Sequence, residues 1–404
     1  MKQPAAGFTN FELTREFFHL PPGLTYLDGN SLGPLPRKLP ASINRVLAEQ
    51  WGELLIGAWE QAEWMVQPFR TGDRIGDLIG APPGTVVVGD TLSVKVYQAL
   101  GAALAMNPGR RIVLTDSGNF PSDLYMAEAL LKTVGEGHQL KVVPPTEVCA
   151  QLNEDVAVLM LTEVDYRTGR RHEMTTLNKI ARECGVITIW DLAHSVGAIE
   201  VDVSGSNADF AVGCTYKYLN GGPGAPAFIY VSKAIIDSVE SPLTGWLGHS
   251  APFKFSPSYD PGPGIARMRI GTPPVVGLFA LDVALDVWEL ATIGDVAQRA
   301  AELTQSFIAG VERTCPEIEL ASPRDPASRG SHVSFRHPEG YAIMRTLIAN
   351  RVIGDFREPD IMRFGFAPLY NGDGCVSTAI QELRKAIDLK PWESECFKVR
   401  AAVT

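Results

Sequence analysis

The chain of 404 residues has no long uninterrupted apolar stretch, and runs such as residues 157–161 are far shorter than a membrane span of ~20 residues. Its beginning has no apolar core followed by a small-residue cleavage site, so we expect no secretory signal. The six cysteines are scattered and form no CxxC pair, which favours reduced thiols over a disulfide framework. We therefore expect a soluble, cytoplasmic protein.

An excess of basic charge and a metal-ligand pattern are also missing. The chain has 36 Lys and Arg against 46 Asp and Glu, and its formal net charge of −10 argues against nucleic acid or an anionic membrane as a partner. The seven histidines form no HExxH motif and no ligand pattern with cysteine or carboxylate, so we expect no metal. Local basic pockets for a phosphate or a carboxylate stay compatible with this composition.

The length exceeds what one compact core holds, which predicts a large domain and a smaller one. Residues 1–40 are rich in proline and glycine and are predicted to form an extended N-terminal arm, and a first amphipathic helix is expected from Ala41. Residues 41–275 are predicted to form a large α/β domain, and residues 276–404 a smaller α+β domain.

Strand-like and helix-like patterns alternate in the large domain, which is typical of a mostly parallel sheet. The run at residues 156–162 is apolar almost throughout, as in a strand buried on both faces. Further strands are predicted at residues 85–88, 111–115, 186–191, 210–214 and 227–231, with a helix at 93–106. Beyond residue 274, long helices are followed by short strands at 331–335 and 361–366 and a last helix at 378–387.

Two charged residues follow neighbouring predicted strands. Asp191 ends the strand at 186–191, and Lys217 comes after the strand at 210–214, between two tyrosines. Taken alone, Asp191 is also explained as a helix cap and Lys217 as a solvated loop lysine. Because they are 26 residues apart (217 − 191), enough for one strand–connection–strand unit, we expect both at the same sheet edge. Pyridoxal phosphate needs this pair: a lysine to hold its aldehyde as a Schiff base, and a carboxylate to keep its ring nitrogen protonated.

Further turns offer a phosphate seat and residues around a ring. Residues 89–93 precede a predicted helix, so its N–H groups and the hydroxyls of Thr91 and Ser93 would face an anion, although an ordinary capping turn explains the segment as well. Phe120 follows a strand and offers a ring for stacking, or packs within its loop. His194, three residues after Asp191, is either a core histidine or part of the site.

Arg363 lies in an alternating strand, beside Gly365 on one face. An arginine next to a residue without a side chain has room to bind a planar carboxylate with two hydrogen bonds. The alternative is a surface arginine on an edge strand.

Five segments together resemble the kynureninases. They are YLDGNSLGP at residues 26–34, WDLAHSVG at 190–197, CTYKYLN at 214–220, GWLGH at 245–249 and APLYN at 367–371. The matches run in order over most of the chain, and their combination is specific where any one alone is weak. The resemblance implies a fold-type I pyridoxal-phosphate enzyme, with a large domain of mostly parallel sheet and a smaller α+β domain. It also implies a homodimer with its active sites at the subunit interface.

The activity implied by this resemblance is hydrolysis of L-kynurenine to anthranilate and L-alanine, in tryptophan catabolism. Carried over by position, Lys217 forms the Schiff base and removes the Cα proton, and Asp191 pairs with the ring nitrogen. The other residues assigned to the cofactor are Leu92, Ser93, Phe120, Asp123, Thr162, His194 and Tyr216, with Trp246 and Thr272 reaching over from the neighbouring subunit. Those assigned to the substrate are Arg363, which binds its carboxylate, and Asn30, Ser31 and Trp59.

Some alternatives remain open. Trp59, Gly271 and Thr272 stand where animal enzymes carry His, Ser and Asn, so the resemblance is to the bacterial members and favours kynurenine over 3-hydroxykynurenine. Either Tyr216 or the cofactor phosphate would activate the attacking water. The rival activities are a class V aminotransferase and a cysteine desulfurase, for which Cys375 is the one cysteine in a glycine-rich turn. A non-catalytic scaffold that kept the fold is the remaining alternative.

Overall fold

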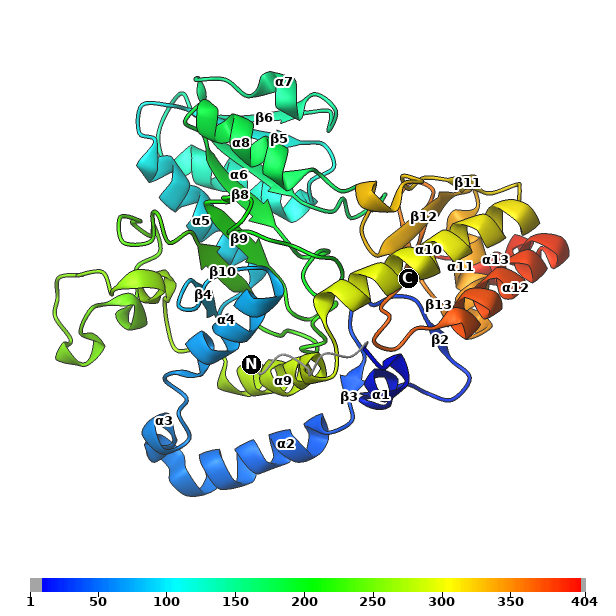
Figure 1. Ribbon diagram of the computed structural model, residues 1–404, viewed down its shortest axis with the longest axis horizontal. Coiled ribbons are helices and arrows are strands. Elements are labelled where there is room, and N and C mark those ends of the chain that lie inside the picture. The colour runs from blue at the N-terminus through cyan, green and yellow to red at the C-terminus, as the bar shows by residue number, and fades with distance from the viewer. Residues whose placement is uncertain (1–8, 401–404) are drawn as a thin grey trace.

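The computed structural model describes residues 9–400. Figure 1 shows a larger α/β part, a smaller part to its right that contains the C-terminal helices, and a long helix, α10 (Ile293–Thr314), that runs between them. Within the described range, no helix is both long enough and apolar enough to cross a bilayer.

The larger part is built on a seven-stranded sheet in the order β4-β10-β9-β8-β7-β5-β6. Its strands are β4 (Val86–Val88), β5 (Ile112–Asp116), β6 (Gln139–Val143), β7 (Val156–Thr162), β8 (Ile187–Asp191), β9 (Phe210–Gly213) and β10 (Phe228–Val231). The strands from β9 to β6 pair in parallel, whereas β10 pairs antiparallel with β4 and β9. The sheet is thus mostly parallel, as the alternating sequence pattern predicts.

Alternation along the strands fills a core on each face of this sheet. In β7, Leu159 and Leu161 join one hydrophobic cluster, and Val158 and Met160 join the other. The helices around the sheet are α4 (Gln67–Leu78), α5 (Leu92–Met106), α6 (Pro121–Thr133), α7 (Val148–Gln151), α8 (Met174–Glu183) and α9 (Val275–Leu285). Apolar side chains on both faces explain why β7 reads as an almost unbroken apolar run.

The smaller part contains a four-stranded antiparallel sheet in the order β11-β12-β15-β14. Its strands are β11 (Glu319–Leu320), β12 (His332–Arg336), β14 (Asp355–Arg357) and β15 (Ile361–Gly365), and its helices are α10, α11 (Gly340–Ala349), α12 (Asp373–Leu389) and α13 (Glu395–Lys398). Phe307 of α10 packs against Phe335 and Phe364 in a core separate from those of the large sheet.

The N-terminal arm is folded onto both parts. It contains α1 (Phe11–Glu16), and β1 (Phe18–His19) pairs with β3 (Leu35–Pro36). Its strand β2 (Thr25–Tyr26) pairs in parallel with β13 (Val352–Ile353) of the smaller part. The arm therefore places its Asp28–Gly33 segment between the two parts.

After the arm, the chain continues along the lower edge in Figure 1. There α2 (Leu39–Arg45) leads through a π-helical segment, Val46–Glu53, towards α3 (Ala58–Gln61). This agrees with the amphipathic helix expected from Ala41.

The predicted domain boundary at residue 275 stays a prediction. By packing, α9 belongs to the core of the large sheet, through Leu278 and Leu281. Along α10, Val296 still joins that core, whereas Leu303 joins the core of the smaller part. The change of core therefore falls inside α10.

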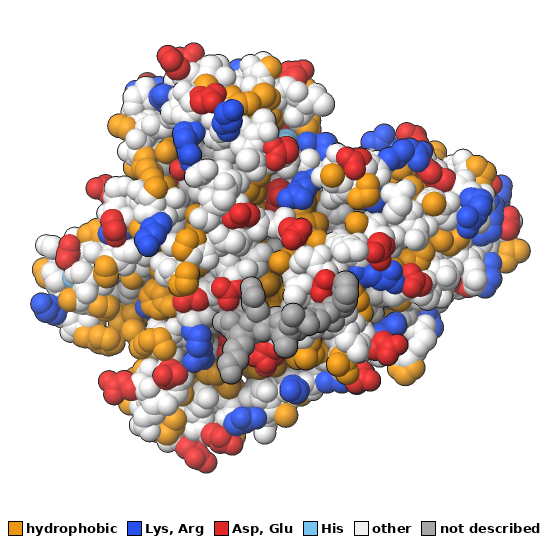
Figure 2. Space-filling model, in the orientation of Figure 1, with side chains coloured by type: hydrophobic (Ala, Val, Ile, Leu, Met, Phe, Trp, Pro, Cys, Tyr) orange, Lys and Arg blue, Asp and Glu red, His pale blue; other side chains and the backbone are white. Residues whose placement is uncertain are grey.

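Large apolar side chains remain exposed at one end of the molecule. Phe253 and Phe255 are 65% and 76% exposed, and Trp246 packs edge-on against Phe253. Figure 2 shows hydrophobic side chains gathered at the left of this face, where Figure 1 has a protruding yellow-green loop. Clustered exposed aromatics of this kind are typical of a surface that contacts another protein.

Candidate active site

Asp191 and Lys217 lie at the same edge of the large sheet. Strands β8 and β9 are parallel neighbours, with Asp191 opposite Val212, and Lys217 follows β9 in the next loop. Asp191 is buried, and its Oδ1 accepts a hydrogen bond from the Ala193 N–H at 2.9 Å. The expected shared edge is therefore present, at the carboxyl ends of the parallel strands, where ligands bind in open α/β sheets.

Two carboxyl groups face this place, Asp191 and Asp123. Burial raises the pKa of Asp191 to about 6, against the opposing effects of Lys217, the Ala193 N–H and the Thr162 hydroxyl. Burial, and then the Asp191 charge, raise the pKa of Asp123 well above its usual range. Oδ2 of Asp123 is buried and has no hydrogen-bond partner among the described residues. A protonated pyridine ring would donate its one N–H to a carboxylate here and compensate a buried negative charge, so the residues present fit pyridoxal phosphate.

Lys217 is surrounded by rings. Its Nζ lies 3.1 Å from Nε2 of His194 and 5.9 Å from the centroids of Phe120 and of Tyr216. Burial, followed by the charge of Lys217, lowers the pKa of His194 well below its usual range, so its imidazole is neutral. A neutral imidazole can accept a hydrogen bond from Lys217 Nζ at Nε2 and donate one through Nδ1, which has no partner among the described residues.

Asn119, which sequence analysis missed, fixes two of the predicted residues. Its side-chain oxygen accepts hydrogen bonds from the Thr162 hydroxyl at 2.5 Å and from the Phe120 N–H at 2.7 Å. Phe120 stands at the start of α6, and 37% of its surface is exposed. The Phe120 backbone is thereby held at the sheet edge, and the exposed part of its ring can stack on a ligand.

The predicted phosphate seat is the turn before α5. This helix begins at Leu92, and its first-turn N–H groups receive no side-chain cap, which leaves them available to an anion. Asp90 in the turn is in the left-handed region, with φ +58°, and its Oδ2 lies 3.0 Å from the buried Nζ of Lys95. Lys95, another residue that sequence analysis missed, thus ties the seat to the helix, and Ser93 lies half-buried beside it.

Arg363 differs from its predicted surroundings. The space above Gly365 is filled by the Asn30 side chain, because a Cβ at Gly365 would lie 1.9 Å from Asn30 Oδ1. The Arg363 guanidinium is instead buried in a bidentate ion pair with Asp355, and it also donates to the Tyr166 carbonyl and to Ser31 Oγ. Charged partners on the short strand β14 were not expected.

The residues of the arm that the sequence predicts to bind the substrate, Asn30 and Ser31, meet this cluster. Both amide atoms of Asn30 are buried without a hydrogen-bond partner in the described part of the chain, as expected of a side chain that awaits a ligand. The Gly33 N–H donates to the Tyr216 carbonyl at 2.8 Å, which brings the arm against the Lys217 loop. The arm thus contacts both the Lys217 loop, through Gly33, and Arg363, through Ser31.

Three predicted residues are not brought to this region by contacts within residues 9–400. Trp59 packs edge-on against Trp64 in and after α3, and Trp246 packs against Phe253. Thr272 is exposed in the segment before α9. None of the three makes a described contact with Lys217.

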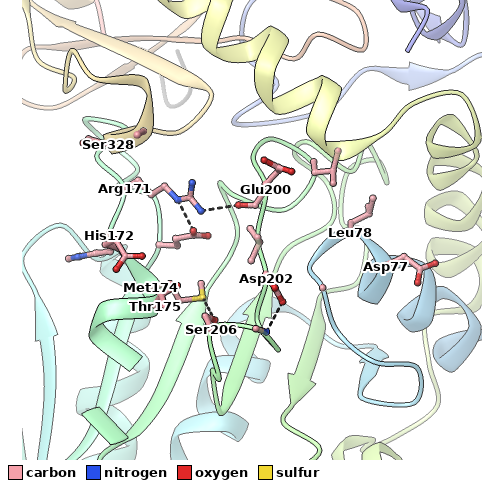
Figure 3. A pocket seen from close by; sticks show the side chains of 17 residues that line it. Asp77, Leu78, Arg171, His172, Met174, Thr175, Glu200, Asp202, Ser206 and Ser328 are labelled. Carbon is pink, nitrogen blue, oxygen red and sulfur yellow. Dashed lines mark hydrogen bonds and ion pairs between the residues drawn. The ribbon is translucent and has the colours of Figure 1, made fainter. Parts of the chain in front are cut away.

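A separate pocket of about 800 Å³ opens between the large and small parts. Figure 3 shows Arg171 reaching across it towards Glu200, whose carbonyl oxygen it contacts at 2.9 Å. Arg171 also pairs with Glu163 at 2.9 Å, and Asp202 and Ser328 lie on the pocket wall. Lys217 and Arg363 are not among the residues that line this pocket.

Comparison with known proteins decides the family. Kynureninase from Pseudomonas fluorescens is 47% identical to this chain over 397 residues, which cover 96% of this chain and 95% of the relative. Kynureninase from Burkholderia pseudomallei strain 1106a is 44% identical over the same shares. The chain belongs to the kynureninase family. A family model described as "Kynureninase C-terminal domain" also matches residues 296–383.

Solved structures of other proteins share the fold of this kynureninase-family chain at low identity. A cysteine desulfurase from Thermococcus onnurineus NA1 matches with a TM-score of 0.77 at 19% identity, covering 95% of this chain and 99% of that one. A C-DES mutant with glycine covalently linked to its PLP cofactor matches with a TM-score of 0.74 at 17% identity, covering 90% and 97%. The fold-type I architecture expected from the sequence is confirmed. Cys375, the candidate desulfurase cysteine, is buried in the first turn of α12.

Proposed function

We propose that this chain hydrolyses L-kynurenine to anthranilate and L-alanine with pyridoxal phosphate held at Lys217. The observation that carries the proposal is the meeting of Lys217, Asp191 and the unpartnered carboxyl of Asp123 at one sheet edge. It is supported by the 47% identity to a kynureninase over nearly the whole chain.

The bound cofactor would supply an electron sink for the bonds at the substrate Cα, a property that depends on a protonated ring nitrogen. Asp191 would hold that proton, because a buried carboxylate favours a cationic partner. Phe120 would stack on the ring, with Thr162 and His194 beside it. Leu92, Ser93 and Tyr216 would bind the phosphate at the start of α5, where N–H groups stand free.

Lys217 would be the proton carrier at the substrate. Once the substrate amine has taken its place, the Nζ of Lys217 is free to remove the proton from Cα. Tyr216, whose pKa burial raises, stays protonated and is suited to donate its phenolic hydrogen bond. It is our candidate for orienting the water that attacks the ketone, with the cofactor phosphate as the alternative.

Arg363, Asn30 and Ser31 would bind the amino-acid end of the substrate. Ser31 Oγ already lies 3.2 Å from the guanidinium of Arg363, and the amide of Asn30 has no described partner. An anionic carboxylate at Arg363 would use charge-assisted hydrogen bonds.

A homodimer would complete the aromatic side of the site. We propose that Trp246 and Thr272 contact the cofactor of the neighbouring subunit, because both are exposed and lie on or beside the apolar end of the molecule. Trp59 would contact the aromatic ring of the substrate. A bulky indole there favours kynurenine over its 3-hydroxy derivative, and we place the enzyme in the cytoplasm, in tryptophan catabolism.

The test combines a spectrum with a product assay. Purified protein should show a visible cofactor band that disappears in Lys217→Ala, and it should release fluorescent anthranilate from L-kynurenine. The matched control is Lys179→Ala, a lysine of α8, which should retain both signals. A band without anthranilate would favour an aminotransferase or a desulfurase, and the absence of any band would favour a non-catalytic scaffold.

A further inference from the structure

Arg363 belongs to a cluster of four charged side chains. Arg363 forms a bidentate ion pair with the Asp355 carboxylate. The same carboxylate lies 2.8 Å from an Arg357 guanidinium nitrogen and accepts a hydrogen bond of 2.6 Å from Ser31 Oγ. Asp28 is the fourth member, and its charge acts on Arg363, Arg357 and Asp355. Asp355 thus has several donors, whereas Oδ1 of Asp28 is buried without a described partner.

The backbone holds Asp28 in this place. Leu27 donates to the Ile353 carbonyl and accepts from the Gly365 N–H, each at 2.7 Å, so the arm runs like an added strand beside β15. Asp28 forms a bridge with Gly365, two residues from Arg363. Asp28 as a residue is only half-buried, whereas Asp355 is buried.

With both acids ionised, the charges of the cluster balance while no substrate is bound. Two carboxylates, Asp28 and Asp355, face two guanidinium groups, Arg357 and Arg363, and the sum is zero. A substrate carboxylate at Arg363 would add a third anion to a largely buried region, where an uncompensated charge is costly. One acid must therefore become neutral, or binding is weakened.

Asp28 is the acid suited to take the proton. Burial, and then the neighbouring charge of Asp355, raise its pKa to about 7, although Ser31, Arg363 and Arg357 oppose this rise. For Asp355, burial is outweighed by Arg363, Arg357 and Ser31, and the pKa is lowered. The two carboxyl groups are thus unequal, and the less well compensated one is also the more exposed.

We propose that binding of the substrate carboxylate at Arg363 is coupled to uptake of one solvent proton by Asp28. This inference rests on the proposed function, because it takes Arg363 to be the carboxylate site. Asp28 would act as a positioning residue: when neutral, it leaves the cluster of Asp355, Arg357 and Arg363 with one net positive charge for the substrate carboxylate.

The other titratable groups around the cluster do not change their protonation state over the same pH range. Tyr26 of β2, Tyr218 of the Lys217 loop and Tyr370 after β15 have pKa values raised by burial, so they stay neutral. Burial and the charge of Arg363 lower the pKa of His332 of β12 to about 3, so it is neutral too. Asp28 is therefore the group of this cluster that titrates near neutrality.

The sign of the pH effect follows from this arrangement. Above about pH 7, Asp28 is ionised in the free enzyme, so binding requires proton uptake and the dissociation constant rises by up to about tenfold per pH unit. At lower pH, Asp28 is already protonated, and both the uptake and the pH dependence fade. In Asp28→Asn the group is always neutral, so affinity should be nearly independent of pH.

The experiment uses the holoenzyme and 4-oxo-4-phenylbutanoate, which has the aryl ketone and the carboxylate of kynurenine but no amine to react with the cofactor. Calorimetric titrations at about pH 8, in two buffers of different ionisation enthalpy, count the protons taken up. We expect roughly one proton in the wild type and in the control Asp388→Asn, and close to none in Asp28→Asn.

The outcomes separate this inference from the proposed function. If Arg363→Met binds the probe as tightly as the wild type, the carboxylate site is wrong, whatever Asp28 does. If Arg363 is required but proton uptake is absent, or is the same in Asp28→Asn, the coupling is refuted while the proposed function stands. Should Asp28→Asn fail to fold, a dissociation constant of the wild type that stays flat from about pH 6.5 to about pH 8.5 would refute it equally.

Discussion

Replacing Asp355 with asparagine should weaken the smaller part of the molecule more than any loss of a surface ion pair. The Asp355 side chain is 3% exposed and that of Arg363 is 1% exposed, so the variant leaves a buried guanidinium without its anion. Removing one partner of a buried ion pair costs about 3–5 kcal/mol. Asparagine keeps one acceptor for Arg363 Nε or Ser31, so we expect about 3 kcal/mol of lost unfolding free energy.

Urea unfolding followed by circular dichroism measures this loss. The matched control is Asp388→Asn, which removes the partner of Arg384 at 2.8 Å from a position that is 61% exposed. Exposed pairs contribute about 0–1 kcal/mol, so the two variants should differ by at least about 2 kcal/mol. Equal losses in the two variants would refute the reasoning that burial makes the Asp355 pair strong.

The pH dependence of the same difference gives a second check. Because the pKa of Asp355 is lowered in the folded protein, its stabilisation is present above the unfolded pKa of about 4. It is lost as the pH falls through the folded-state pKa, since the carboxyl then becomes protonated in both states. The difference in unfolding free energy between wild type and Asp355→Asn should therefore be largest at neutral pH and decrease in acid.

Two further predictions concern the cofactor. Asp191→Asn should still bind pyridoxal phosphate, but it loses the ion pair that keeps the ring nitrogen protonated. Because such a pair is worth roughly 4 kcal/mol at ~4 Å, turnover measured as anthranilate release should fall by at least about a hundredfold. A rate within tenfold of the wild type would contradict that role for Asp191. Gly33→Ala should lower cofactor occupancy, because its Cβ would lie 2.3 Å from Asn220 Oδ1 and 2.5 Å from the Lys217 carbonyl. The cofactor absorbance per subunit measures this occupancy. The control Gly109→Ala, whose Cβ would meet no atom within 4 Å, should bind the cofactor as the wild type does.

Local signals in the sequence were sufficient for the central sheet. The predicted strand at residues 156–162 coincides with β7, and that at 186–191 differs from β8 by one residue. A strand that is buried on both faces has no alternation of polar and apolar residues. It can therefore be predicted from its apolar run alone, without knowing which strands it pairs with. The shared edge of Asp191 and Lys217 followed from this alone.

The ion cluster around Arg363 could not be found in this way. Asp28 and Asp355 are brought together by pairing of segments at opposite ends of the chain, and single-sequence patterns carry no information on such pairing. The edge strand β6 was missed for a different reason, since its half-exposed, mixed residues give no clear period. The sequence did contain one signal for this ion cluster. Asp355 and Arg357 have opposite charges and share one face of a three-residue strand.

The pairing of β2 with β13 also bears on how the protein is made. During synthesis, Thr25 leaves the ribosome before the strands of the large sheet, whereas its neighbour Val352 follows after all of them. The large sheet can form before that, since its strands lie between residues 86 and 231. An arm that is translated before the large sheet therefore pairs only after that sheet can form, and the region around Ser31 and Arg363 would be completed late in folding.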